Sequence, residues 1–191
     1  MLNQVSKHIA NCLCGPSSKS QEYQICSYGI ELALHTFLST LGLLLIGLAM
    51  HRVAEAFIVV LIFYTNQTTG GGYHATTHIK CFLAMAAGML LCLLTTYIFL
   101  PEIILYLLII FAASYLWIHP VCLHKNKLYL QFEIATLKRK ARIVVLASSV
   151  AAVCMGFWVK TPSVLQCGSI AMVASCISRA FGLAYSKHAN Q

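Results

Sequence analysis

Five apolar runs, each near the length of a transmembrane helix, are the feature that most limits what this chain can fold into. Crossing a bilayer takes about 20 mostly apolar residues in a helix. Hydrophobic residues make up 59% of the chain and charged residues 9%, against about 25% charged residues in soluble domains. The sequence therefore predicts an all-α, polytopic helical membrane protein, with these runs as its spans: 27–50, 82–100, 102–118, 143–159 and 163–184.

A sixth, shorter run covers residues 53–65, and its 13 residues are few for a full span. Two structures fit it: a short helix that extends into the polar segment that follows, or a re-entrant helix buried in protein. Glu55 within this run is expected to lie near an interface or to pair with a basic residue, because a lone carboxylate is costly inside a bilayer. We therefore expect about six transmembrane segments, with 53–65 either spanning or re-entrant, in a single domain over residues 1–191.

The amino-terminal segment, residues 1–24, has no continuous apolar stretch of the kind that a cleavable signal peptide needs. Its apolar residues recur at helical spacing, at Leu2, Val5, Ile9 and Leu13. That spacing predicts an amphipathic helix that lies at the bilayer surface. A frayed polar terminus is the alternative.

The chain carries 13 Lys and Arg against 5 acidic residues, a formal net charge of +8. With a cytoplasmic amino terminus and six spans, ten of the basic residues fall on the cytoplasmic side, the outer turns hold Arg52 and Lys160, and Arg179 lies within the last span. The positive-inside rule explains this asymmetry, so we expect no nucleic-acid partner. Both termini are expected in the cytoplasm.

Pro101-Glu102 divides the apolar residues 82–118 into a helical hairpin. Proline disrupts a helix interior and glutamate is costly at the bilayer centre, so both suit a turn. The hairpin returns the chain to its starting side. The polar segment 66–81 and the basic stretch 119–142, expected to be a cytoplasmic loop, should therefore share one membrane face.

The nine cysteines are scattered, odd in number and mostly inside apolar runs, so they do not indicate a disulfide framework. His119, Cys122 and His124 place three metal-ligating residue types within six positions, but a fourth is missing. No nucleotide-binding loop is present. We therefore predict no metal site and no cofactor.

The segment 66–81 combines three glycines with residues that carry chemistry. Gly70, Gly71 and Gly72 precede His74, and Cys81 lies seven positions beyond it, in the expected first turns of the next helix. On a continuous helix, His74 and Cys81 would be about 10 Å apart along the axis, too far for proton transfer. A working base and thiol therefore require a folded loop, which consecutive glycines permit. A helix amino terminus favours the thiolate.

His78 is the rival base, since it lies three positions before Cys81 and faces the same side of a helix. Spacing alone leaves His74 and His78 as equal candidates. A polar interhelical loop with an incidental thiol is the third interpretation.

The run Gly71-Gly72-Tyr73-His74-Ala75, followed by Cys81, resembles the G-G-x-H-A-x-x-x-x-x-C signature of the accessory gene regulator B family. Chain size, the surrounding apolar runs and a basic stretch that opens with His119-Pro120 are also similar. The resemblance implies a bacterial membrane cysteine endopeptidase that processes a quorum-sensing propeptide. It implies His74 as the catalytic base and Cys81 as the nucleophile, and it places His78 at a variable position.

Two positions depart from the family pattern. The family usually has arginine seven residues before the histidine, where this chain has Gln67, and a serine can follow the nucleophile, where this chain continues with Phe82. Gln67 is a candidate for substrate positioning or for donation to an oxyanion; a solvated loop glutamine is the other interpretation.

The basic residues Lys125, Lys127, Lys138, Arg139, Lys140 and Arg142 have two compatible roles. They orient the chain and attract anionic lipid, and they are candidates for holding the acidic tail of a propeptide. The partners implied are thus the bilayer, a propeptide with an amphipathic start and an acidic tail, and a second copy of the chain in a homodimer. A peptide exporter and a non-enzymatic membrane partner of a signalling system are the competing functions.

Overall fold

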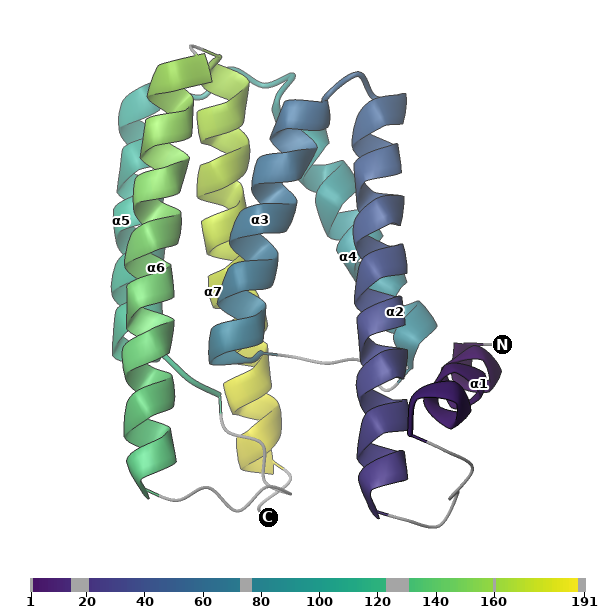
Figure 1. Ribbon diagram of the computed structural model, residues 1–191. Helices are drawn as coiled ribbons and strands as arrows, with labels where there is room; N and C mark the ends of the chain where they lie inside the picture. The colour runs from purple at the N-terminus through teal and green to yellow at the C-terminus, as the bar shows by residue number, and fades with distance from the viewer. Residues whose placement is uncertain (1, 15–20, 73–76, 123–130, 160, 189–191) are drawn as a thin grey trace. The chain divides into compact units, whose positions relative to one another are not determined.

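The computed structural model describes residues 2–14, 21–72, 77–122, 131–159 and 161–188 (Figure 1). This described part contains helices and no strand, which confirms the all-α prediction. The chain divides into two compact units, Met1–Leu43 and Leu44–Gln191. The helices are α1 (Leu2–Cys14), α2 (Gln21–Ala49), α3 (Val53–Gly70), α4 (His78–Thr95), α5 (Glu102–Ile118), α6 (Gln131–Val159) and α7 (Pro162–His188).

The first unit holds α1 and most of α2. The helix predicted near the amino terminus is present as α1, and Ala10 on this helix is fully buried. The hydroxyl of the buried Tyr23 on α2 donates to the carbonyl of Lys7 at 3.3 Å. Val5, by contrast, is half exposed. That helix α1 lies at a bilayer surface stays a prediction.

In the second unit, α7 is the central helix and packs against α3, α4, α5 and α6. Every residue from Val164 to Ser169 is buried, so this part of α7 is covered on all sides. Small residues allow the close approach: a β-carbon at Gly168 would lie 3.1 Å from that of Ala152 on α6. Close backbone packing at small residues is typical of helices that associate in membranes.

Three of the described helices are long and apolar enough to cross a membrane, over Tyr23–Ala49, Phe132–Trp158 and Pro162–Tyr185. Shorter apolar helices cover Ile79–Thr95 and Glu102–Ile118. The run 53–65 forms an 18-residue helix that extends to Gly70, the longer of the two forms considered for it. The number of spans, about six, stays a prediction.

Helix α6 begins at Gln131, so residues 131–142 are helical and not part of a loop as the sequence analysis expected. In the sequence analysis, the charged residues indicated a loop. A helix can nevertheless continue beyond its apolar region when its charged side chains lie on the exposed face. Lys138, Arg139 and Lys140 are exposed, whereas Ala141 and Val145 on the other face are almost completely buried.

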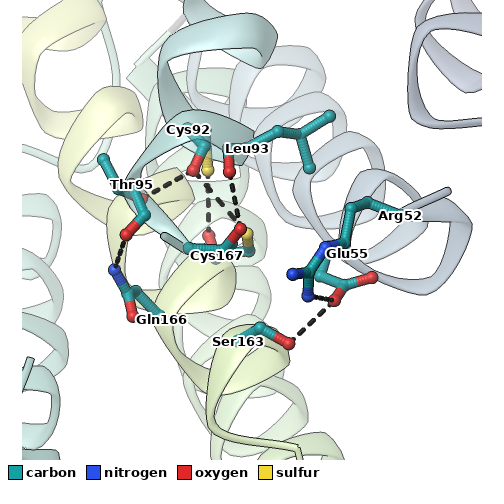
Figure 2. Close-up of polar contacts among 9 residues, drawn as sticks. Arg52, Glu55, Cys92, Leu93, Thr95, Ser163, Gln166 and Cys167 are labelled. Carbon is teal, nitrogen blue, oxygen red and sulfur yellow. Dashed lines mark hydrogen bonds and ion pairs between the residues drawn. The ribbon is translucent and has the colours of Figure 1, made fainter. Parts of the chain in front are cut away.

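The end of the bundle that carries the α2–α3 and α4–α5 turns is tied to α7 by polar contacts (Figure 2). Glu55 forms an ion pair with Arg52 at 3.0 Å and accepts from the hydroxyl of Ser163 at 2.7 Å, which confirms its predicted pairing. The amide of Gln166 donates to the carbonyl of Thr95 at 2.6 Å, where α4 ends.

The thiols of Cys92 on α4 and Cys167 on α7 each donate to the other residue's carbonyl, at 3.8 and 3.9 Å (Figure 2). Both thiols are buried and neither is in a disulfide. The predicted turn is present, since α5 begins directly after Pro101, and α4 ends at Thr95, five residues before the end of the apolar run. Over their described residues, the two helices do not pack against each other as a helical hairpin would, because each packs against α7 instead.

At the opposite end, α3 ends, α4 begins, α5 ends and α6 begins (Figure 1). The backbone N–H of Cys122 donates to the carbonyl of Gly70 at 2.8 Å. The start of the basic stretch therefore lies against the start of the glycine-rich segment, as the hairpin argument predicted. That this end faces the cytoplasm stays a prediction.

Candidate functional site at the glycine-rich end of the bundle

Gly71 ends α3 in a conformation that favours glycine. Its φ is 70°, in the left-handed region, and its N–H donates to the carbonyl of Gln67 at 2.9 Å. A β-carbon there would also lie 3.0 Å from the carbonyl oxygen of Cys122. Its ψ is −175°, and this combination of angles is essentially restricted to glycine, which has no β-carbon to clash. The chain therefore leaves α3 in a defined direction.

Arg179 of α7 holds this exit. Its side chain is 1% exposed, and Nε donates to the carbonyl of Gly71 at 2.8 Å. Nη2 donates to the carbonyl of Asn66 at 3.0 Å. Nη1 donates to the carbonyl of His119 at 3.1 Å and also to that of Pro120. One guanidinium thus bonds to backbone from the end of α3 and from the segment after α5.

Gln67 is bound from α7 as well. Its Nε2 donates to Oγ of Ser178 at 3.0 Å, and Oε1 lies 3.2 Å from the same hydroxyl. A β-carbon at Gly72 would lie 2.6 Å from Oε1 of Gln67 and 2.7 Å from Oγ of Ser178. These contacts hold the glycine-rich segment against α7, a role that the sequence analysis did not consider. Substrate positioning and contact with an oxyanion both stay predictions for Gln67.

Cys81 is the fourth residue of α4, and Thr77 stabilises the start of this helix. The backbone N–H of Lys80 donates to the Thr77 hydroxyl at 3.3 Å, and the N–H of Cys81 donates to the Thr77 carbonyl at 3.0 Å. Helical side chains point back toward the amino terminus, so the thiol is directed toward the positive end of the helix dipole. Cys81 is partly exposed and not in a disulfide.

Cys122 is a second cysteine near the end of α3, where its backbone N–H donates to the carbonyl of Gly70. Burial raises the pKa of its thiol, and the nearby Arg179 guanidinium partly offsets that effect. A raised pKa leaves little thiolate near neutral pH, and the thiolate is the nucleophile. Cys122 is therefore a poorer nucleophile than an unburied thiol.

Several predicted site residues fall outside the described part of the chain. They are His74, Lys125 and Lys127. The backbone of His78 begins α4, but its side chain is also outside the described part. Within that part, no three His, Cys, Asp or Glu side chains are grouped as a metal site would require.

The described basic residues on α6 divide into two sets. Lys138, Arg139 and Arg142 line a hollow of about 420 Å³ between α6 and Trp117 of α5. The guanidinium of Arg142 lies over the Trp117 ring at 5.4 Å and donates to the Trp117 carbonyl at 3.4 Å. Lys140 is exposed and does not line the hollow.

The sequence analysis missed the roles of Ser178 and Arg179 at this site. One signal for Arg179 was present, because it is the single charged residue in the apolar run 163–184. An ionisable residue inside a membrane-spanning helix is by default a candidate functional residue. No pattern marked Ser178.

Apolar helices of this length, together with a polar site at one end of the bundle, define an α-helical membrane protein. Residues 5–179 match the sequence model of the accessory gene regulator B family, so the chain belongs to that family. Membership implies involvement in the processing of agr quorum-sensing peptides. No curated protein and no solved structure matches the chain significantly.

Proposed function

We propose that this protein is a membrane cysteine endopeptidase that cleaves an autoinducer propeptide and closes the retained part into a ring. The observation that carries the proposal is the placement of Cys81. Its partly exposed thiol lies in the first turns of a capped helix, directly after the glycine-rich loop. Membership of a family that acts on a quorum-sensing propeptide supports the same function.

In the proposed reaction, His74 accepts the proton of the Cys81 thiol, and the thiolate attacks the carbonyl carbon of one peptide bond. The C–N bond then breaks, and the leaving amine takes the proton back from the His74 imidazolium. The carboxyl-terminal fragment departs, and the retained peptide stays on Cys81 as a thioester. His74 is then neutral again and can act as a base in the second step, whereas Cys81 stays acylated.

In the second step, a cysteine or serine side chain of the retained peptide attacks the thioester carbonyl. His74 accepts the proton of the attacking group, the C–S bond to Cys81 breaks, and the departing sulfur takes that proton from the His74 imidazolium. The product is a cyclic thiolactone or lactone, and the free Cys81 thiol is restored. Exchange of one thioester for another is nearly neutral in free energy, so ring closure needs no ATP if water is kept out. Exclusion of water at the membrane edge would favour this outcome over hydrolysis.

The hollow on α6 supports a role in substrate binding. Lys138, Arg139 and Arg142 bring three positive charges to one concave surface beside an aromatic ring. An acidic propeptide tail is complementary to that surface in charge. We propose that the tail binds there, and that Lys125 and Lys127 extend the basic surface.

The test is co-expression of the chain with a short peptide encoded by a neighbouring reading frame, one with an amphipathic start, a central Cys or Ser and an acidic tail. Parent, Cys81→Ala, Cys81→Ser, His74→Ala and His78→Ala chains are compared by mass spectrometry of the peptide products. We expect both Cys81 variants and His74→Ala to abolish cleavage, and His78→Ala to retain it.

Cleavage that survives Cys81→Ala would remove Cys81 as the nucleophile. Loss with His78→Ala but not with His74→Ala would reverse the assignment of the base. Export of unprocessed peptide that is independent of Cys81 would favour the exporter function.

A further inference from the structure

Within the described part of the chain, the buried Arg179 guanidinium donates its hydrogen bonds to backbone carbonyls. The partners come from two helix ends: Asn66 and Gly71 at the end of α3, and His119 and Pro120 after α5. The last carbonyls of a helix have no partner within the helix and carry the negative end of its dipole. Arg179 donates to the carbonyl of the C-cap residue of each helix, Gly71 and His119, so its positive charge lies between the two negative helix ends.

Arginine suits this position and lysine does not. The guanidinium is planar and presents five donors in a rigid fork, so its three nitrogens can reach carbonyls in several directions at once. A lysine ammonium is a single point on a flexible stem. Replacement of Arg179 by lysine would keep the charge but would leave some of these buried carbonyls unpaired.

The contact with Gly71 has a consequence for His74. His74 is three positions after Gly71, and three steps of the chain reach at most about 11 Å. Thr77, the N-cap of α4, follows His74 by another three positions. The positions of Gly71 and Thr77 therefore limit how far His74 can be from each of them, and Arg179 holds Gly71.

Gly70 provides a second, independent observation. A β-carbon at Gly70 would collide with three atoms of the Arg179 guanidinium. The close approach brings the guanidinium against the backbone of α3 at the start of the glycine-rich segment. The absence of a side chain at Gly70 thus leaves the space that the Arg179 guanidinium fills.

We propose that Arg179 is a positioning residue for the His74–Cys81 pair: by bonding to Gly71 it sets where the glycine-rich loop begins, and it docks the segment after α5 on that loop. The proposal rests on the proposed function, since it needs His74 to serve Cys81. Arg179 itself does not contact the substrate in this proposal.

The test measures alkylation of Cys81 by iodoacetamide in the full-length chain in membranes, from pH 5.5 to 9.5, by mass spectrometry of the peptide that carries Cys81. A thiolate paired with an imidazolium reacts well below the ordinary thiol pKa of about 8.5. We expect Arg179→Lys to lower the rate at pH 6.5 about tenfold and to leave the rate at pH 9.5 within about twofold, because only the pairing is lost. A purely structural role would change both rates together, and that result would overturn the proposal.

Arg52→Lys is the matched control, because Arg52 makes its ion pair with Glu55 on the far side of the same unit. It should leave the alkylation profile unchanged. His74→Ala separates this inference from the proposed function. If reaction at low pH survives His74→Ala, the His74–Cys81 pair is wrong; if it needs His74 but survives Arg179→Lys, only the role of Arg179 is wrong.

If Arg179→Lys does not fold, Gly70→Ala in the otherwise unchanged chain takes its place in the same measurement. We expect Gly70→Ala to reduce the reaction at pH 6.5 and to leave the rate at pH 9.5 within about twofold, since its β-carbon displaces the guanidinium. An unchanged rate at pH 6.5, or an equal loss at both pH values, would overturn the proposal.

Discussion

The guanidinium of Arg179 occupies the space in which a β-carbon at Gly70 would lie. These two residues are more than 100 positions apart in the chain. The arginine side chain fits against the backbone at the end of α3 because Gly70 has no β-carbon. The neighbouring pair repeats the arrangement, since Ser178 and Gln67 fill the space beside Gly72. Gly70 and Gly72 thus lack side chains where Arg179 and Ser178 of α7 pack against the backbone.

Gly71→Ala is expected to destabilise the protein by about 1–2 kcal/mol, because alanine at a φ of 70° is strained. The new β-carbon would also press on the carbonyl of Cys122. The measurement is the free energy of unfolding in mixed detergent micelles. Gly88→Ala is the matched control: this glycine is inside α4 with open space around it, and alanine there should stabilise the helix by up to about 1 kcal/mol. Equal effects at the two glycines would contradict the assigned geometry of Gly71.

Thr77→Ala is expected to loosen the start of α4. The variant loses the hydroxyl that accepts from the N–H of Lys80, and such caps contribute about 1 kcal/mol, or about fivefold in local opening. Hydrogen exchange of the amides of residues 78–81 should quicken by that factor. Thr77→Ser keeps the acceptor and should exchange at nearly the parent rate. Unchanged exchange in Thr77→Ala would mean that the hydroxyl does not stabilise this helix end.

Cys122 should react slowly with alkylating reagents near neutral pH. Because burial raises its pKa, the thiolate fraction increases only at a pH above that of an unburied thiol, whose midpoint is about 8.5. The rate of iodoacetamide modification of Cys122, followed by mass spectrometry against pH, should therefore have its midpoint above that value. The chain unfolded in urea provides the reference, where the midpoint should return to the ordinary one. A folded-state midpoint at or below the reference would show that burial does not control this thiol.

Lys138→Ala combined with Arg139→Ala should weaken binding of an acidic propeptide tail, because both residues line the hollow on α6. Loss of two charges from a complementary surface is expected to raise KM about tenfold with little change in kcat, and to reduce the dependence of KM on salt. The measurement is cleavage kinetics in proteoliposomes that contain the variant. Lys140→Ala, outside the hollow, should raise KM by no more than about twofold. Equal effects of the two changes would favour a diffuse electrostatic attraction over a defined tail site.

Local chemistry made some features predictable. A lone glutamate is costly in an apolar run, so an interface position or pairing with a basic residue was predicted for Glu55, and the structure identifies the partner as Arg52, three positions before it. Pro101 likewise predicted the turn between α4 and α5, and the apolar periodicity of residues 2–13 predicted α1. In each case, the interacting residues are close in sequence.

The start of α6 and the contacts of α7 were not predictable in this way. The charges of residues 138–142 were assigned to a loop, because sequence alone does not show which face of a helix a neighbour will cover. Gln67 is hydrogen-bonded to Ser178, which lies 111 positions away in the chain. Small polar residues give no periodic signal of such a contact.

By itself, the sequence determined that this chain is an all-α membrane protein of the accessory gene regulator B family, since apolar length and a short motif are both local properties. It also predicted that the glycine-rich segment and the basic stretch share one end of the molecule, from the hairpin between them. Only the tertiary structure decided what holds that end together. Buried helix ends leave carbonyls that need donors, and the packing of α7 in the centre of the bundle brings Arg179 to the carbonyls of two helices at once.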